Sequence, residues 1–193
     1  GKGIISNYNL FDGISCCFLD FDTEEVMPSQ KFNPDIISIV HCHTGRYECE
    51  FSNHQIFYLS EGYFSIMGTK YLPISFSFPL KKCYAFSLVI DKHAINQIQK
   101  YFKMFNIDID HLSDKLALDE KGYLSQPSSD LKHLFSEIYS AKDKEKIEYF
   151  RIKALEFLYH IASLSRHNKS DFKYYDKKYI QLAKEIHNSM IER

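Results

Sequence analysis

The sequence predicts an α+β fold in which an antiparallel β-barrel or sandwich precedes an α-helical segment. From Gly3 to about Ile90 the chain reads as short segments of period two, separated by turn residues, which is typical of antiparallel β-structure. After Asp91 the apolar residues recur with a helical period. An aromatic share of 16%, with 16 Phe and 14 Tyr, also favours many strands.

The strand prediction rests on alternation between turn signals. The expected strands span 4–10, 14–21, 36–43, 46–51, 55–59, 63–67, 74–78 and 84–90, and the breaks between them carry Gly, Pro, Asn or Asp. In the last strand Tyr84, Phe86, Leu88 and Ile90 share one face.

Helices are expected at 95–105, with Asp91 as a cap, at 129–141 and at 146–164. The third of these is apolar over so much of its circumference that we expect it to contact a second chain as well as its own barrel. A helix buried within its own domain is the alternative. A polar linker over 165–176 precedes a final helix capped by Asp176, and this helix reaches the end of the sequence without a stop signal.

The overall composition points to no particular class of charged partner. The net charge of −1 and the pI near 6.8 do not indicate nucleic acid, a membrane surface or a polyanionic substrate as a partner. Only the segment 165–193 is mildly basic, with seven Lys or Arg against four acidic residues. Five cysteines without regular spacing indicate reduced thiols, and no leader or membrane span is evident, so we expect a cytoplasmic protein without membrane association.

The stretch "IVHCHTGRYECE", residues 39–50, raises the question of a metal site. If Thr44 and Gly45 form a two-residue hairpin turn, His41 faces Glu48 across the two strands. One face then carries His41, His43, Arg46, Glu48 and Glu50, and the other carries Val40, Cys42, Tyr47, Cys49 and Phe51. The apolar set is expected inside the barrel, which turns the histidines outward.

A metal-dependent enzyme remains the alternative interpretation of this stretch. The spacing of His41, His43 and Glu48 is similar to the first half of the metal-binding signature of cupin barrels, but the later strands offer no further histidine. Cysteines beside these histidines point to the opposite face of the strand, so a Cys and His pair is not expected. We therefore expect no metal, no cofactor and no enzymatic activity.

Several spaced patches together resemble one family. The segments "IISIVHCHTGRYECEFSNHQIFYLSEGYFSIM", "FSFPLKKCYAFSLVID", "EYFRIKALEFLYHIASL" and "YYDKKYIQLAKEIHNSMIER" are similar to the amino-terminal regulatory part of AraC/XylS-type bacterial transcription regulators. The resemblance implies a cupin-like sensor barrel over 1–90, a helical dimerisation segment over 91–168, and a linker with the first helix of a DNA-binding domain over 169–193. The helix-turn-helix units that bind DNA in this family would follow Arg193, so this chain alone is not expected to recognise an operator.

The resemblance also implies a small-molecule effector and a homodimer. The expected effector contacts point into the barrel: Cys42, Tyr47 and Cys49 from the hairpin, and Phe76, Phe78, Tyr84 and Phe86 from later strands, with Arg46 and Glu48 as polar contacts if the register slips. The expected dimer contacts on the third helix are Lys153, Glu156, Tyr159, His160 and Ser163, with the first helix as the competing surface. Plain hydrophobic core remains the alternative for each barrel residue, and a protein-binding module without an effector remains the alternative function.

Overall fold

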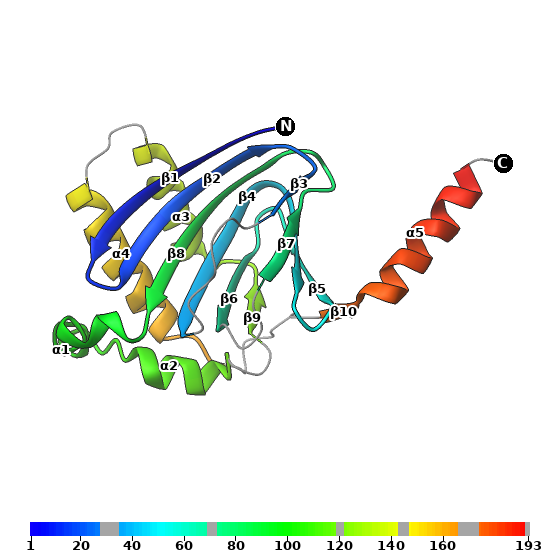
Figure 1. Ribbon diagram of the computed structural model, residues 1–193. Coiled ribbons are helices and arrows are strands. Elements are labelled where there is room, and N and C mark those ends of the chain that lie inside the picture. Colours follow the sequence, from blue (N-terminus) through cyan, green and yellow to red (C-terminus); the bar gives the residue numbers. More distant parts are fainter. Residues whose placement is uncertain (28–34, 69–72, 119–121, 143–146, 166–173, 192–193) are drawn as a thin grey trace.

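An antiparallel barrel followed by helices forms the body of the protein in the computed structural model, which describes residues 1–27, 35–68, 73–118, 122–142, 147–165 and 174–191 (Figure 1). The α+β class predicted from the sequence is confirmed. The strands are β1 (Lys2–Phe11), β2 (Ile14–Asp22), β3 (Glu25–Val26), β4 (Ile36–Phe51), β5 (Gln55–Ser60), β6 (Phe64–Gly68), β7 (Pro73–Ser77), β8 (Cys83–Asp91), β9 (Tyr123–Ser125) and β10 (Tyr174–Asp176). The helices are η1 (Ala94–Gln97), α1 (Gln99–Met104), α2 (Ile109–Leu116), α3 (Ser129–Ala141), α4 (Ile147–Ala162) and α5 (Lys177–Ile191).

Strand β4 is the central element of the barrel because it pairs with strands on both of its sides. Its first part lies between β8 and β6, and its second part lies between β5 and β7. All of these pairings are antiparallel. Outward from β8, the sheet continues through β2 to β1. A single strand therefore connects both ends of the barrel.

The hairpin predicted at Thr44 and Gly45 is wrong, because β4 continues without a break from Ile36 to Phe51. The residues that suggested a turn instead form a β-bulge against β8: Cys42 pairs with Ala85 and Thr44 pairs with Tyr84, which leaves His43 as the extra residue. Gly45 has a φ of 90°, and a Cβ there would lie 2.0 Å from the carbonyl oxygen of Lys82. Glycine is needed for the bend, but the chain does not reverse.

The bulge explains why the inward and outward residues of the stretch 39–50 were predicted correctly although the predicted turn is absent. An extra residue shifts the alternation of the strand by one, as a two-residue turn would. Val40 and Cys42 therefore share the barrel interior with Tyr47, Cys49 and Phe51, as predicted. The expected pair of His41 and Glu48 does not form, since both residues belong to one strand.

Helices α3 and α4 cover the outer face of the sheet formed by β1, β2, β8, β4 and β6 (Figure 1). Large apolar side chains from this face and from the helices make one core that includes Phe18, Phe64, Phe86, Phe135 and Phe157. A second, smaller core fills the barrel itself. The molecule is thus layered as helices, sheet and barrel interior.

The predicted helices agree with the structure where apolar periodicity is long. The helix expected at 129–141 is confirmed as α3, whose cap Ser128 accepts a hydrogen bond from the Leu131 main-chain N–H. The helix expected at 95–105 is divided into η1 and α1. The short elements α2, β3, β9 and β10 were not predicted, and most of the expected linker, residues 166–173, lies outside the described residues.

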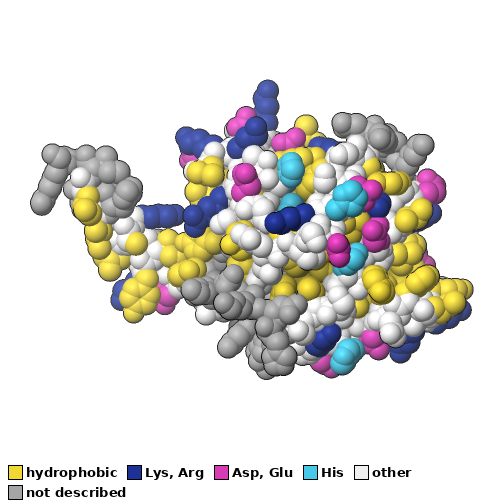
Figure 2. Space-filling view, turned by 180° about the vertical axis from the view of Figure 1, so that it is seen from behind, with side chains coloured by type: hydrophobic (Ala, Val, Ile, Leu, Met, Phe, Trp, Pro, Cys, Tyr) yellow, Lys and Arg dark blue, Asp and Glu magenta, His cyan; other side chains and the backbone are white. Residues whose placement is uncertain are grey.

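The final helix, α5, projects from the body and carries an apolar stripe (Figure 2). Its exposed apolar side chains are Tyr179, Leu182, Ile186 and Met190. Strand β10 joins it to the barrel by pairing with β5. No helix within the described ranges has the length and apolarity needed to cross a lipid bilayer.

Candidate functional site

The inner face of the barrel has one end lined by small side chains. On β2, β4, β6 and β8 the large apolar residues point outward into the helix-covered core, so their alternating neighbours point inward. We call this inner surface the small-residue face; it consists of Ser15, Cys17, Ser38, Val40, Ser65, Ser87 and Val89. Ser15, Cys17, Ser38 and Val89 are partly exposed, whereas Val40, Ser65 and Ser87 are buried.

Cross-strand pairing places these small residues side by side. Cys17 is opposite Ser87, Ser87 is opposite Val40, and Val40 is opposite Ser65. Residues directly opposite have Cβ atoms about 4.5–5.5 Å apart, so the row is continuous across four strands. Burial raises the pKa of the Cys17 thiol to about 11, opposed by a hydrogen bond to Ser87, so this thiol is neutral at pH 7.

Ser65 is the unusual member of the row. Its side chain is 0% exposed, and its hydroxyl has no hydrogen-bond partner within the part of the chain that the structure describes. A buried hydroxyl without a partner destabilises a fold by about 1–3 kcal/mol and is rare in folded proteins. Such a group is suited to a hydrogen bond with a ligand.

The opposite end of the interior is filled by aromatic side chains. Phe21 and Phe78 stack with ring centroids 4.9 Å apart, and Tyr47 and Phe76 stack at 5.6 Å. Phe57 is fully buried in the same cluster. Of the predicted effector contacts, Cys42, Tyr47, Cys49 and Phe78 belong to this packed core, and Phe76 packs against it.

Tyr84 and Phe86 do not point into the barrel as expected. Cys83 and Ala85 face inward, as Ser87 and Val89 of the same strand do. Phe86 is instead buried in the core beneath the helices, and Tyr84 packs against that core. The predicted shared face was correct, but its direction was wrong. The larger side chains face the helices because that layer provides the larger apolar core.

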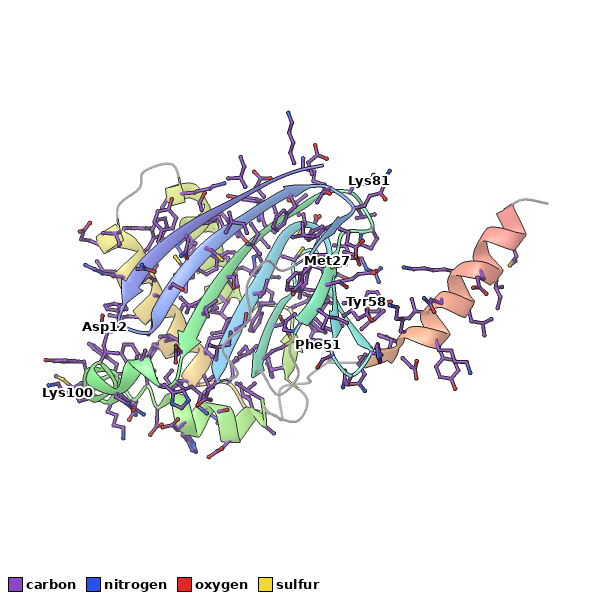
Figure 3. The ribbon with its side chains drawn as sticks, viewed as in Figure 1. Asp12, Met27, Phe51, Tyr58, Lys81 and Lys100 are labelled. Atoms are coloured by element: carbon purple, nitrogen blue, oxygen red, sulfur yellow. The ribbon has the colours of Figure 1, made fainter. Side chains whose placement is uncertain are left out.

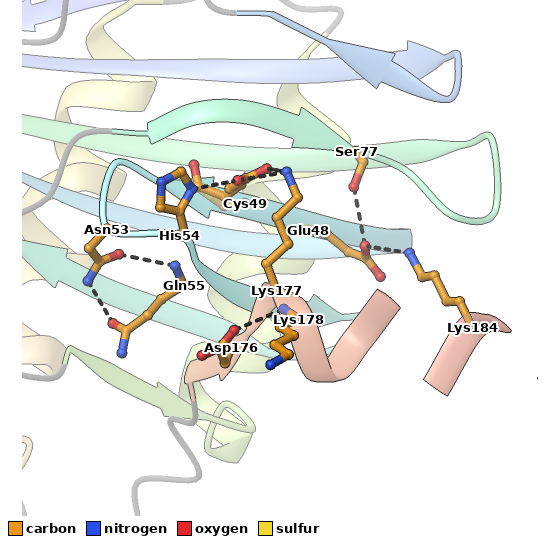
Figure 4. Close-up of polar contacts among 11 residues, drawn as sticks. Glu48, Cys49, Asn53, His54, Gln55, Ser77, Asp176, Lys177, Lys178 and Lys184 are labelled. Carbon is orange, nitrogen blue, oxygen red and sulfur yellow. Dashed lines mark hydrogen bonds and ion pairs between the residues drawn. The ribbon is translucent and has the colours of Figure 1, made fainter. Parts of the chain in front are cut away.

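The outer face of the second half of β4 holds a cluster of charges that attaches α5 to the barrel (Figure 4). Lys177 Nζ is 2.9 Å from Glu50 Oε2, and Lys184 Nζ is 3.9 Å from Glu48 Oε2. The side chain of Ser77 donates a hydrogen bond of 3.2 Å to the carboxylate of Glu48. Arg46 Nε lies 3.5 Å from Glu48 Oε1. Arg46 and Glu48 therefore lie outside the barrel, and Glu48 is only 5% exposed because these groups cover it.

Aromatic contacts complete this attachment. Figure 3 shows Tyr58 on the side of the barrel that faces β10 and α5. The guanidinium of Arg46 lies 4.5 Å from the centre of the Tyr58 ring, and the rings of Tyr58 and Tyr175 meet edge to face at 5.3 Å. The strand pairing, the ion pairs and the rings together connect β4 and β5 to the terminal helix.

The two histidines of the opening motif lie beneath and beside helix α3. His41 is 6% exposed, and its ring stacks on Phe135 with centroids 3.9 Å apart. The Tyr139 hydroxyl donates to the His41 main-chain carbonyl at 3.1 Å and lies 3.0 Å from His41 Nδ1. Burial, with a smaller contribution from His43, lowers the pKa of His41 to about 4. The expectation that both histidines face solvent holds for His43 and is wrong for His41, because α3 covers it.

The set expected for the metal alternative does not converge. His41 contacts α3, whereas Glu48 is held by Arg46, Ser77 and Lys184 further along the same strand. Across the described ranges, no group of three or more His, Cys, Asp or Glu side chains is arranged to hold a metal ion.

The residues predicted to contact a second chain at α4 differ in how far they are exposed and in whether they already have partners within the chain. Tyr159 is 57% exposed, and Ile152, seven positions earlier and therefore on a similar face, is 62% exposed. Lys153 is engaged within the chain, with Nζ 2.7 Å from Glu137 and 2.8 Å from Glu156. Ser163 donates a hydrogen bond to the main-chain carbonyl of His160.

Sequence reasoning missed the small-residue face, although a repeated pattern marks it. The segments "ISCC", "ISIV", "FSIM" and "FSLV" begin at Ile14, Ile37, Phe64 and Phe86. Each places a large apolar residue before a serine and an outward residue after it. A serine at the inward position of four strands was the available signal.

Comparison with known proteins gives structural similarity only. No family model matches the chain, and no curated protein matches its sequence. Among solved structures, ToxT from Vibrio cholerae O395, bound to (E)-4-(8-methylnaphthalen-1-yl)but-3-enoic acid, is 7% identical over 75% of this chain and 55% of its own, with a TM-score of 0.46.

Other similar structures cover about half of this chain. An HTH_3 family transcriptional regulator from Vibrio cholerae is 17% identical over 45% of this chain and 49% of its own, with a TM-score of 0.38. A cupin 2 conserved barrel domain protein from Salinispora arenicola is 10% identical over 50% of this chain and 84% of its own, with a TM-score of 0.39. This chain thus spans about half the length of ToxT and of the HTH_3 family regulator.

Proposed function

We propose that this chain is the effector-sensing and dimerisation region of an AraC-type bacterial transcription regulator, which binds a small molecule without transforming it. The observation that carries the proposal is the buried, unpartnered hydroxyl of Ser65 within the small-residue face. The sequence patches that resemble the AraC/XylS family support the same function. The effector would accept or donate a hydrogen bond at Ser65 and cover Val40 and Ser87.

Strand β4 provides the route from the effector to the terminal helix. Ser38 and Val40 on its first half belong to the small-residue face, and Glu50 on its second half pairs with Lys177 of α5. The bulge at His43 separates the two halves. A ligand that favours one geometry of this bulge would shift the equilibrium between attached and released α5. In this proposal α5 passes the change to a DNA-contacting region.

The first prediction concerns Ser65→Val. Removing an unpartnered buried hydroxyl should raise the free energy of unfolding by about 1 kcal/mol, measured by urea unfolding. In a panel of small metabolites, at least one compound should raise the melting temperature of the unmodified protein, and Ser65→Val should reduce that rise. Ser60→Val, at an exposed position on β5, serves as the matched control.

Two outcomes would contradict this account of the site. A loss of stability in Ser65→Ala, which removes the hydroxyl without adding bulk at this buried position, would mean that the hydroxyl has a partner in solution. A panel in which no compound raises the melting temperature would favour a protein-binding module over an effector sensor.

We further propose that two copies of the chain associate through α4. The exposed side chains of Ile152 and Tyr159 support this contact, since they add apolar area on one side of a helix whose other side is buried. In a twofold dimer the same face of α4 meets itself. Contact of the dimer with DNA would depend on helix-turn-helix units and not on α4.

A further inference from the structure

A pocket lies outside the barrel, between β4 and α3. It has a volume of about 560 Å³, and its lining includes His43, Tyr84, Lys132, Ser136 and Tyr139. It is separate from the small-residue face, which lies on the inner side of the same sheet. Its residues belong to elements far apart in the sequence, which α3 brings over the strands.

Aromatic rings from β4, β8 and α3 form one wall of this pocket. The His43 and Tyr139 rings lie 4.3 Å apart at an interplanar angle of 32°, and the Tyr84 and Tyr139 rings lie 5.2 Å apart. His43 meets Tyr84 edge to face at 5.7 Å. Faces and edges of rings in this arrangement suit a planar ligand, because aromatic pairs favour offset-stacked and edge-to-face contacts.

The charge and hydroxyl groups of the pocket suit an anion. Lys132 contributes an ammonium group, and Ser136 and Ser140 follow it at intervals of four residues, so the three share one face of α3. No Asp or Glu is found among the described lining residues. The Ser140 hydroxyl donates to the main-chain carbonyl of Ser136 at 2.8 Å, so the donors left for a carboxylate are the Lys132 ammonium and the Ser136 hydroxyl.

The hydrogen bonds beneath the pocket fix its floor. Because the Tyr139 hydroxyl donates its proton to the His41 carbonyl, it accepts the proton of His41 Nδ1, and both groups are satisfied within the protein. These hydrogen bonds hold Tyr139 in place, so it offers a ligand in the pocket its aromatic ring and not its hydroxyl. Polar recognition of the ligand then belongs to Lys132 and Ser136.

We propose that this pocket binds a small planar aromatic carboxylate, with the ring against His43, Tyr84 and Tyr139 and the carboxylate at Lys132. The ligand class follows from the combination of an aromatic wall with one ammonium group and no Asp or Glu among the described lining residues. The pocket lies beside the bulge of β4, so the bound ligand contacts the strand that also carries the small-residue face.

The test uses phenylacetate as the probe and amide chemical shifts of the whole chain as the readout. Phenylacetate should bind at least tenfold more tightly than phenylacetamide, which lacks the charge, and than cyclohexylacetate, which lacks the aromatic face. Lys132→Gln should weaken phenylacetate binding at least tenfold and leave phenylacetamide unchanged. Lys178→Gln, at an exposed position on α5, is the matched control and should change neither.

The variant Ser65→Val distinguishes binding of phenylacetate in this pocket from binding at the effector site in the barrel. If phenylacetate binds in the pocket between β4 and α3, Ser65→Val should leave its affinity unchanged. This holds whatever effect the variant has on compounds that bind in the barrel. The proposal is overturned if phenylacetate does not bind, if Lys132→Gln binds it as tightly as the unmodified chain, or if cyclohexylacetate binds equally well. Loss of binding in Ser65→Val would also overturn it, because the ligand would then lie in the barrel.

Discussion

Acidification from pH 7 to pH 4 is expected to lower the free energy of unfolding by on the order of 3 kcal/mol through His41 alone. The pKa of this histidine falls from its ordinary value of 6.5 to about 4 in the folded chain, chiefly because α3 buries it. The unfolded chain therefore binds a proton below pH 6.5 that the folded chain does not bind until about pH 4. The contribution is fully present above pH 6.5 and is lost as the pH falls.

Urea unfolding of the unmodified chain and of His41→Gln at pH 7 and pH 4 measures this effect. The variant should be less stable at pH 7, since it loses the stacking on Phe135, but its stability should fall by about 3 kcal/mol less between the two pH values. His111→Gln, at an exposed histidine of α2, is the control and should keep the full dependence. An equal dependence in all three chains would show that His41 takes up its proton at an ordinary pH.

Tyr159→Glu is expected to dissociate the proposed dimer, with a dissociation constant raised at least a hundredfold. The ring is 57% exposed in the single chain, and pairing through α4 would bury it beside its own copy. A carboxylate at that position would have to lose its water within an apolar contact, which is strongly unfavourable. Light scattering as a function of protein concentration measures the mass directly.

The competing dimer surface supplies the matched control. Phe105 follows α1 and is 54% exposed, similar to Tyr159, and Met104 beside it is also exposed. Phe105→Glu should leave the mass unchanged if α4 forms the contact. Dissociation by Phe105→Glu but not by Tyr159→Glu would place the contact at α1 instead.

Much of the fold could be predicted because each layer has a regular period. The strands alternate and α3 carries a clean apolar stripe, so their positions follow from local patterns. The bulge in β4 could not be predicted in the same way. "TG" is compatible with a turn or with a bend inside a strand, and only the pairing of both halves of β4 with β8, β5, β6 and β7 decides between them.

The candidate site was predicted only in part. Whether a strand face is buried, and against which layer, depends on elements that are distant in the sequence. The alternation of Tyr84 and Phe86 was evident, but a strand between two apolar layers gives no sign of which layer each face meets. His41 was expected at the surface because α3, almost one hundred residues later, cannot be placed over it from local sequence. The effector roles assigned to Cys42, Tyr47, Cys49, Phe76 and Phe78 stay predictions, as do those of Arg46 and Glu48.

The most direct test of the account follows the amide signals of the chain during titration with a compound selected by the thermal panel. The account predicts that the amides of Ser65 and Ser87 and those of Tyr175 and Lys177 shift together with one dissociation constant, because β4 connects the small-residue face to the attachment of α5. Shifts at Ser65 and Ser87 that leave Tyr175 and Lys177 unchanged would contradict it.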